Sequence, residues 1–303
     1  MNYYDSHAGF TFTNVKLQVT EITVKQNHYC VSRIDEVYFN EEVDFTKDKE
    51  TKITSLLQAA FEELSIINSI VSSSASFSLP QELFVTARLP IEESLLNLDL
   101  LEEFRWNLAI MYPYLNWNDY VIEHNEVDGR HFDSNDFALV FALNRKYIKI
   151  INDFCARNNL KLKFIDHCHL ASNNILNMNL LSKANNHFSI YISQKILSVL
   201  VSIAGKPVYY EDIPITSVHE VRGLIKDKLS ELNQKHFNFS EVFLFGDSAS
   251  ITIANALTET TGIIFNLVNP FSQLKTDISL LTSHYYTGTN HFFSPTLGVA
   301  ARI

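Results

Sequence analysis

The spacing of apolar residues changes from strand-like to helix-like within the first 80 positions. β-rich sequence covers residues 10–22, and a second run at 29–39 alternates apolar and polar positions. Residues 51–64 carry apolar side chains at helical spacing, and a serine-rich segment then leads into a short apolar run at 77–79. The order strand, strand, helix, strand is typical of the start of an α/β lobe.

The rest of the chain predicts two further units. An α+β unit of roughly eighty residues alternates strands with two helices, the first stopped by Pro113, over 83–89, 98–111, 121–125, 137–143, 147–154 and 162–165. A second α/β lobe combines helices and strands over 170–181, 188–203, 206–213, 218–232, 242–245, 251–260 and 263–267. No low-complexity linker separates these units, so we expect lobes that are packed together or interleaved in sequence.

Glycine is scarce, and its scarcity excludes two kinds of phosphate site. The 303 residues and 34.7 kDa are enough for two lobes. They contain only eight glycines, and consecutive ones lie no closer than Gly288 and Gly298. The motifs G-x-G-x-x-G and G-x-x-x-x-G-K-[ST] need closely spaced glycines because a Cβ would block the approach of backbone to phosphate. Neither motif occurs in this chain.

Charge and hydropathy restrict the possible partners. The net charge of -10 argues against a nucleic-acid binder that depends on a positive field. The hydrophobic content of 46% supports a folded core, and no apolar run approaches the ~20 residues of a membrane span. The first residues lack a signal-peptide pattern, so a cytoplasmic location is expected. The widely spaced Cys30, Cys155 and Cys168 predict reduced, buried thiols.

Several strings match a known family in order along the chain. Residues 9–22 read G-F-T-F-T-N-V-K-L-Q-V-T-E-I, and residues 77–80 read F-S-L-P. The string R-W-N-L-A at 105–109 precedes Y-P-Y, and later matches are I-D-H-C-H-L-A-S-N-N-I-L at 165–176, N-L-V-N-P-F at 266–271 and T-L-G-V-A-A-R at 296–302. Together they resemble the actin-like ATPases and, within them, the PilM family of type IV pilus assembly proteins, which is related to FtsA. The resemblance covers nearly the whole chain.

The resemblance implies an α/β fold of the actin-like (ribonuclease H-like) type, with two lobes and an inserted α+β subdomain. The first lobe would comprise residues 1–82, 163–185 and 284–303. The inserted subdomain would comprise 83–162, and the second lobe 186–283.

The residues at the family's phosphate-binding positions differ from the family pattern. The resemblance places Thr11 where the family has its first Asp and Thr13 where it has a loop Gly, in a turn that is one or two residues shorter. In the second hairpin, Tyr191 stands at the second Asp and Ser193 at its Gly. A hydroxyl cannot replace a carboxylate that organises Mg²⁺.

The remaining positions complete a vestigial nucleotide cleft. At the adenosine-side motif G-G-G-A only Gly246 keeps a glycine, and Asp247 adds a negative charge. The full set is Thr11, Thr13, Asn14, Lys16, Tyr191, Ser193, Gly246 and Asp247. We expect no nucleotide cofactor and no metal. One alternative keeps an anion on Lys16, Lys195, Ser193 and Thr13; the favoured interpretation has solvated lysines and a Tyr191 that fills the cleft and packs the lobes together.

The favoured function is a non-catalytic scaffold, a pseudo-ATPase of the PilM type. The resemblance implies a protein partner, the cytoplasmic tail of a PilN-like inner-membrane protein, bound in a groove between the first lobe and the inserted subdomain. Membrane association would then be peripheral and through that partner. Two alternatives stay open: a weakly active ATPase that uses ATP and Mg²⁺, and a family member used outside pilus assembly.

Other residue clusters were weighed against ordinary structural roles. The string 246–250 is one glycine short of a nucleophile elbow, and a helix N-terminus capped by Asp247 or Ser248 is favoured. The run 166–169, D-H-C-H, could bind a metal, but cleft-lining or surface histidines are favoured. The acidic residues Asp99, Glu102 and Glu103 predict a solvated helix start. The aromatic residues near them could bind a peptide, but core packing is expected for most of Phe104, Trp106, Tyr112, Tyr114 and Trp117.

Overall fold

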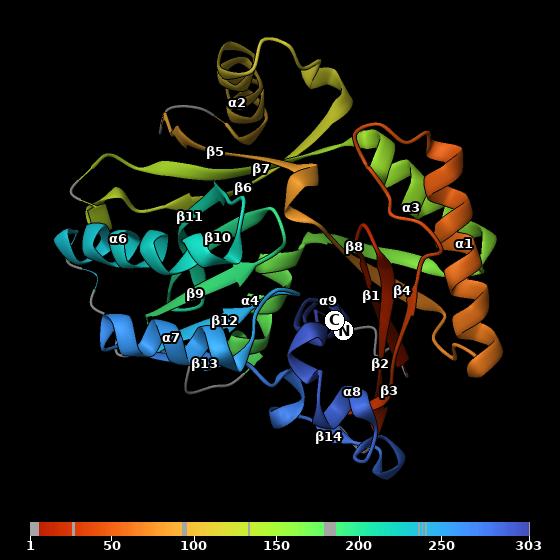
Figure 1. Cartoon of the computed structure of the whole chain (residues 1–303). Coiled ribbons are helices and arrows are strands. Elements are labelled where there is room, and N and C mark those ends of the chain that lie inside the picture. The colour runs from red at the N-terminus through yellow and green to blue at the C-terminus, as the bar shows by residue number, and fades with distance from the viewer. Residues whose placement is uncertain are drawn as a thin grey trace.

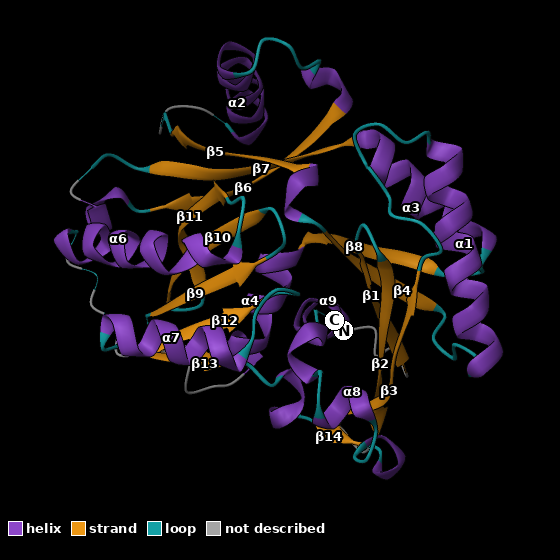
Figure 2. Ribbon diagram, viewed as in Figure 1, coloured by secondary structure: helices purple, strands orange, loops and turns teal. Residues whose placement is uncertain are grey.

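The computed structural model describes residues 6–25, 28–92, 96–132, 134–178, 186–235, 237, 239 and 241–302. Within these residues the strands form three sheets, and helices cover their faces (Figures 1 and 2). The predicted α/β class is therefore confirmed.

A six-stranded sheet forms the core of the first lobe. Its strand order is β14 (Lys275–Thr276), β3 (His28–Tyr38), β2 (Lys16–Lys25), β1 (Ser6–Phe12), β4 (Ser74–Leu79) and β8 (Lys161–His167). The helices α1 (Glu50–Ile67) and α3 (Arg145–Arg157) pack their apolar sides on one face. Phe154 of α3 lies edge-on against Phe61 and Phe77, with ring centroids 5.2 and 5.7 Å away.

Two helices on the other face close the first lobe. They are α4 (Cys168–Met178) and α9 (Ser294–Ala300), and every residue of α9 is buried. The approach of α9 to α4 requires glycine, because a Cβ on Gly298 would lie 1.8 Å from the backbone oxygen of Ala171. The short helix α8 (His284–Thr287) precedes α9 near the β14 edge.

A five-stranded sheet with the same topology forms the second lobe. Its order is β11 (Lys206–Pro214), β10 (Ile196–Ile203), β9 (His187–Ile192), β12 (Glu241–Phe245) and β13 (Ile264–Leu267). In both lobes three antiparallel strands are followed by a helix and then by a strand parallel to the first. The helices α6 (Val221–Gln234) and α7 (Ile251–Thr261) contribute to the apolar core of this sheet.

A three-stranded antiparallel sheet joins the two lobes. Its order is β5 (Phe84–Pro90), β7 (Phe137–Asn144) and β6 (Tyr120–Val127). Side chains of β7 alternate between its faces. Phe137, Leu139 and Phe141 enter the core of the second lobe. The opposite face is covered by α2 (Asn97–Met111), which lies apart from the other helices at the top of Figure 1.

The predicted elements are present, with their ends shifted by a few residues. The helix predicted at 170–181 begins at Cys168, and its predicted end at Leu181 lies outside the described residues, as does the domain boundary at 185. The three-part domain division stays a prediction. Two contacts bear on it: α3, assigned to the inserted subdomain, packs in the core of the six-stranded sheet, and β14, assigned to the second lobe, pairs with β3.

Candidate functional site

A narrow cleft lies where the two lobes meet, beside the turns that follow β1 and β9. It brings together six of the eight predicted site residues: Thr11, Thr13, Asn14, Tyr191, Ser193 and Asp247. The other lining residues are Pro80, Gln81, Glu82, Cys168, Gln194 and Lys195. Lys16 and Gly246 lie next to this set without lining the cavity.

The cavity in this cleft has a volume of about 30 Å³. A cavity needs roughly 10–15 Å³ on this measure to hold one water molecule, whereas sites for small-molecule ligands commonly span about 300–1,000 Å³. A nucleoside triphosphate does not fit the cavity as it stands.

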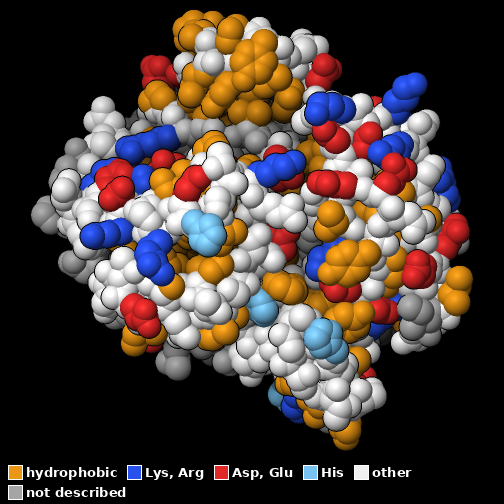
Figure 3. Space-filling view, viewed as in Figure 1, with side chains coloured by type: hydrophobic (Ala, Val, Ile, Leu, Met, Phe, Trp, Pro, Cys, Tyr) orange, Lys and Arg blue, Asp and Glu red, His pale blue; other side chains and the backbone are white. Residues whose placement is uncertain are grey.

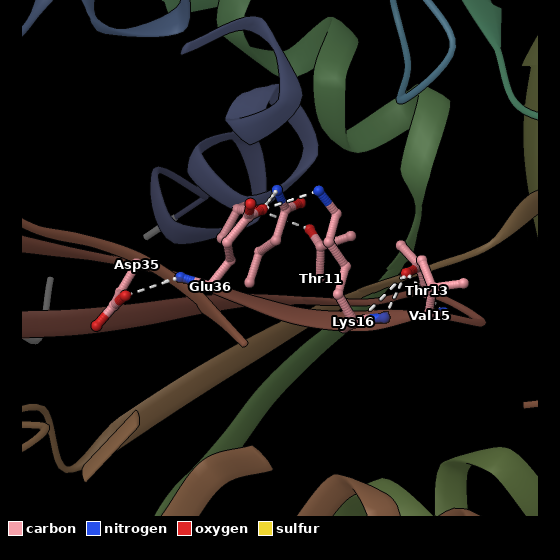
Figure 4. Close-up of polar contacts among 8 residues, drawn as sticks. Thr11, Thr13, Val15, Lys16, Asp35 and Glu36 are labelled. Carbon is pink, nitrogen blue, oxygen red and sulfur yellow. Dashed lines mark hydrogen bonds and ion pairs between the residues drawn. The ribbon is translucent and has the colours of Figure 1, made fainter. Parts of the chain in front are cut away.

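The first hairpin satisfies its own amide groups. The hydroxyl of Thr13 accepts hydrogen bonds from the amides of Val15 (3.3 Å) and Lys16 (3.1 Å) (Figure 4). The amide of Thr13 in turn donates to the carbonyl oxygen of Lys16 at 3.0 Å. Phosphate-binding loops present free backbone amides to the anion. In this turn the threonine side chain already occupies the amides that a phosphate would use.

The second hairpin repeats this arrangement. The hydroxyl of Ser193 accepts from the amide of Ile196 at 3.0 Å, and the amide of Ser193 donates to the carbonyl oxygen of Ile196 at 2.9 Å. Both residues that replace a family glycine therefore close their turns internally.

Tyr191 fills the space between the lobes. It is 5% exposed and packs with Cys168, Leu176 and Phe245 in a small apolar cluster. Its ring centroid lies 5.9 Å from that of His169. Burial raises the pKa of the Tyr191 hydroxyl well above its ordinary value, so it stays neutral. The packing of Tyr191 against both lobes is as predicted. That its ring takes the place of a nucleotide stays a prediction.

Lys16 is not the solvated residue that the sequence predicts. It is 4% exposed, and its ammonium group donates to the carboxylate of Glu36 at 2.8 Å (Figure 4). Gln18 donates to the same oxygen, also at 2.8 Å. Glu36 comes from β3, and the pairing of β2 with β3 places it opposite Gln18. The prediction was wrong because cross-strand register is not visible in the sequence. Lys195, by contrast, is exposed as predicted.

Gly246 lies directly against the backbone of β9, and Asp247 follows it at the cleft. Gly246 adopts a φ of +107°, and a Cβ there would lie 2.2 Å from the backbone oxygen of Ile192. The close approach of two strands therefore explains this glycine without a nucleotide. Burial raises the pKa of Asp247, and the nearby positive charge of Lys16 opposes that rise. A carboxyl group at this position would repel an anionic phosphate.

The helix after Asp247 is capped at a different residue from the one predicted. Ser250, not Asp247 or Ser248, caps α7, and its hydroxyl accepts from the amide of Ile253 at 3.3 Å. The amide of Ser248 instead donates to the backbone oxygen of Ile192 at 3.1 Å.

The D-H-C-H run forms part of a buried polar network. His169 contacts the hydroxyls of Ser198 (2.7 Å) and Ser189 (3.0 Å). His167 contacts the hydroxyl of Tyr210 at 2.9 Å, and Tyr210 donates to Asp212 at 2.6 Å. The expectation of surface histidines was wrong, because both rings are buried and bonded across the lobes. His167 does line a cleft, the one between β8 and the inserted sheet. Within the described residues no group of three or more His, Cys, Asp or Glu side chains is placed to hold a metal ion.

The network contains titratable groups that sequence reasoning missed. Burial lowers the pKa of His167 to about 3, and it raises the pKa of Asp212 to about 6. Asp212 joins the second lobe to the inserted sheet, because it accepts a hydrogen bond from Thr86 of β5 and another from Tyr210 on its own strand. His167 belongs to the D-H-C-H run, but no motif in the sequence marks Tyr210, Asp212 or Thr86.

The aromatic residues of α2 and the loop after it divide between core and surface. Phe104 and Trp117 are 0% and 4% exposed, as core packing predicts. Tyr112 packs against the same core, whereas Trp106 and Tyr114 are 65% and 78% exposed. Core packing therefore holds for three of the five, in line with the expectation for most of them. Asp99 and Glu102 are exposed at the beginning of α2, as predicted, whereas Glu103 is half-buried.

A second, larger groove lies between the inserted sheet and β8. Its volume is about 530 Å³. Apolar side chains from β5, β7, β8 and α3 line it, together with polar groups of β6 and β8 and with Arg302. Arg302 donates to Asp166 at 2.6 Å, and its guanidinium lies 5.1 Å from the ring centroid of Phe164. The sequence did not identify these residues because they come from several separate segments.

Comparison with known proteins identifies the fold. No protein-family profile matches the sequence, and a search of curated proteins finds no match. Among solved structures, a chain of a PilM-PilN type IV pilus biogenesis complex superposes with a TM-score of 0.78 at 14% sequence identity, over 98% of both chains. A Bacteroides thetaiotaomicron protein with an actin-like ATPase fold and unknown function superposes with a TM-score of 0.51 at 14% identity, over 86% of this chain and 90% of the other. The chain therefore has the actin-like ATPase fold that its sequence predicts, in an arrangement shared along nearly its whole length with the PilM-PilN structure.

Proposed function

We propose that this chain is a non-catalytic, PilM-like scaffold that binds the cytoplasmic tail of an inner-membrane protein in a pilus or secretion-type assembly. The observation that carries the proposal is the contrast between two cavities. The nucleotide position has about 30 Å³ of space, and the groove beside β8 has about 530 Å³.

The filled cleft supports a scaffold without ATPase chemistry. Thr13 and Ser193 occupy the amides of the two hairpins, and Tyr191 takes the space between them. Catalysis of phosphoryl transfer depends on positioning the phosphates and on a metal ion that neutralises their charge. Neither Thr11 nor Tyr191 supplies a carboxylate for that ion, and Asp247 would oppose the phosphates.

The position of the groove supports a protein partner. It lies between the first lobe and the inserted sheet, which is where the resemblance to the PilM family implies that a PilN-like tail docks. One solved structure with this fold is itself a PilM-PilN complex. A volume of about 530 Å³ would hold a few residues of an extended peptide.

The walls of the groove favour an extended, mixed apolar and polar segment. β8 is the last strand of the six-stranded sheet and β6 the last strand of the three-stranded sheet, so within the described part of the chain each has one edge without a strand partner. An exposed strand edge can bind an extended peptide through main-chain hydrogen bonds. Phe84, Leu162 and Phe164 offer apolar contacts, and Glu123 and Lys163 offer charged ones.

A membrane location would follow from the partner. Among the described residues no helix has the length and apolar character needed to cross a bilayer. The scaffold would be held at the cytoplasmic face of the inner membrane by the tail that it binds.

Binding of a labelled tail peptide tests the proposal. The probe is the N-terminal cytoplasmic segment of the PilN-like protein from the same organism, and the readout is fluorescence anisotropy. We expect saturable binding that Phe164→Ala weakens at least tenfold, because the ring is 39% exposed in the groove. Leu281→Ala is the matched control, since Leu281 is 40% exposed away from the groove and should leave binding unchanged.

Two results would contradict the proposal. Absence of binding by the unmodified protein would favour a family member used outside pilus assembly. Equal losses in the Phe164 and Leu281 variants would place the tail elsewhere on the molecule.

A further inference from the structure

Arg302 is held in a fixed position in the wall of the groove beside β8. Its guanidinium donates to Asp166 at 2.6 Å and lies 5.1 Å from the ring centroid of Phe164. The side chain of Arg302 is 48% exposed, whereas that of Asp166 is 9% exposed. A segment that enters the groove therefore meets the guanidinium rather than the carboxylate that holds it.

The pair of Arg302 and Asp166 presents hydrogen-bond donors to the groove. Arginine carries several N–H donors in a planar fork and no acceptor, and the bond to Asp166 uses one nitrogen, Nη1. Both oxygens of Asp166 already accept hydrogen bonds, Oδ1 from the amide of His167 at 2.9 Å and Oδ2 from Arg302. A carboxylate is the group that binds the remaining donors most strongly, because it can accept two parallel bonds from one fork.

The two walls of the groove carry opposite charges. β8 and the chain end contribute three basic side chains, of which Lys163 and Arg302 line the groove, against the one buried carboxylate of Asp166. β6 contains no Lys or Arg and two glutamates, of which Glu123 lines the groove. On the face of the molecule shown in Figure 3, acidic and basic side chains are interspersed. The groove instead separates the two signs of charge.

An extended segment can contact both walls at once. Successive side chains of an extended chain point to opposite sides. A segment that lies along the groove, between the edges of β8 and β6, can therefore direct one side chain at Arg302 and the next at Glu123. Opposite charges on its two sides would match the two walls.

We propose that the groove selects a segment with separated charges: an acidic side chain that Arg302 binds and, on the other side of the segment, a basic side chain that lies toward Glu123. This inference rests on the proposed function, because it names the chemistry of the tail that the groove binds. Asp166 and Phe164 keep the guanidinium in place, so little side-chain freedom is lost when the tail binds. The charges supply specificity in addition to the apolar contacts.

Peptide variants test the proposal without altering the protein. The probe is the labelled tail peptide of the PilN-like protein, with each Asp or Glu replaced in turn by its amide, and the readout is fluorescence anisotropy. One such replacement should weaken binding about tenfold or more, because it removes a charge-assisted contact. Raising NaCl from ~50 to ~500 mM should also weaken binding of the unmodified peptide severalfold.

Protein variants assign the contact to Arg302. Arg302→Gln should weaken binding of the unmodified peptide about tenfold, and on that background the amide replacement should cause no further loss. Arg302→Lys can keep the ion pair with Asp166 but loses the planar fork, so it should fold and still bind more weakly than the unmodified protein. Arg130→Gln is the matched control: Arg130 also pairs with an aspartate, but lies outside the groove, so binding should be unchanged.

A second variant tests the opposite wall. Glu123→Gln changes an exposed side chain, so the fold should be kept. It should weaken binding about threefold or more, because it removes the charge that faces the basic side chain of the tail. Replacing that Lys or Arg of the tail by Gln should cause the same loss, and the two changes together should cause no more than either alone.

The outcomes separate this inference from the function on which it rests. Absence of tail binding by the unmodified protein would overturn both. Binding that Phe164→Ala weakens, but that the amide peptides, Arg302→Lys and Glu123→Gln leave unchanged, would overturn the inference and leave the scaffold function standing. Losses that simply add in the cycle between Arg302→Gln and the amide peptides would also overturn it, because the two groups would then not be in contact.

Discussion

Lowering the pH from 7 to 5 should destabilise this protein, because two buried histidines are held neutral. Burial lowers the pKa of His7 to about 4 and that of His167 to about 3. Both ring nitrogens of His7 contact serine hydroxyls at 2.9 Å, and the ring is 0% exposed. In the unfolded chain each histidine binds a proton near pH 6.5. The unfolded state therefore takes up protons between pH 7 and 5 that the folded state does not.

The magnitude follows from the size of these shifts. A pH of 5 lies about 1.5 units below the pKa of a histidine in the unfolded chain, while the folded rings are still neutral. Each histidine therefore lowers the free energy of unfolding by about 2 kcal/mol, and the pair lowers it by about 4 kcal/mol. Asp212 acts in the opposite direction. Because its pKa is about 6 in the folded state, protonation of Asp212 between pH 7 and pH 5 raises the free energy of unfolding by about 1 kcal/mol. Burial also lowers the pKa of His169, which adds to the loss of stability. Burial raises the pKa values of Asp166 and Asp247, and both reduce the loss. The groups with stated pKa values give a net loss of about 3 kcal/mol.

Urea unfolding at pH 7 and pH 5, followed by circular dichroism, measures this effect. His167→Gln removes one of the two titrations, so its stability should change less between the two pH values than that of the unmodified protein. The matched control is His219→Gln, which alters an exposed histidine outside this network. A protein as stable at pH 5 as at pH 7 would refute the reasoning, since it would mean that these rings accept protons in the folded state.

Three other predictions concern packing, ion pairing and thiol access. Gly246→Ala should destabilise the fold by about 3 kcal/mol or more, because its Cβ would lie 2.2 Å from a backbone oxygen. The control is Gly223→Ala in the helix α6, where the added Cβ meets no atom within 4 Å, and it should stabilise the fold by about 0.5–1 kcal/mol. In the same urea assay Lys16→Ala should lower the free energy of unfolding by about 3 kcal/mol, because it leaves the largely buried carboxylate of Glu36 without its ion pair. The control Lys149→Ala removes an exposed ion pair and should change stability by less than about 0.5 kcal/mol. The three buried thiols should react with a thiol reagent only after denaturant is added, and rapid reaction of the native protein would contradict their burial.

The periodicity of the sequence predicts most elements of the fold but not how they meet. Helical spacing in 51–64 and alternation in 29–39 identify α1 and β3, because those patterns reflect one buried face each. The burial of α9 and the two-residue strand β14 were not predicted from periodicity. Both depend on contacts with segments distant along the chain.

The candidate site divides in the same way. Family positions identify Thr13, Ser193 and Tyr191, and the structure adds that the two hydroxyls close their own turns. The burial of Lys16 depends on the register between β2 and β3, which no local pattern records. The groove beside β8 depends on the packing of three sheets and helices, so its residues could not be chosen from the sequence.

The scaffold proposal depends on a cleft that holds no nucleotide, and calorimetric titration of ATP with Mg²⁺ into the protein tests it most directly. Thr13, Ser193 and Tyr191 stand where the resemblance to the PilM family places the phosphates and the metal, and the cavity beside them is about 30 Å³. We predict no saturable heat up to about 1 mM nucleotide, a limit that corresponds to binding weaker than about -4 kcal/mol. Micromolar binding accompanied by ATP turnover would contradict the account and would favour a weakly active ATPase.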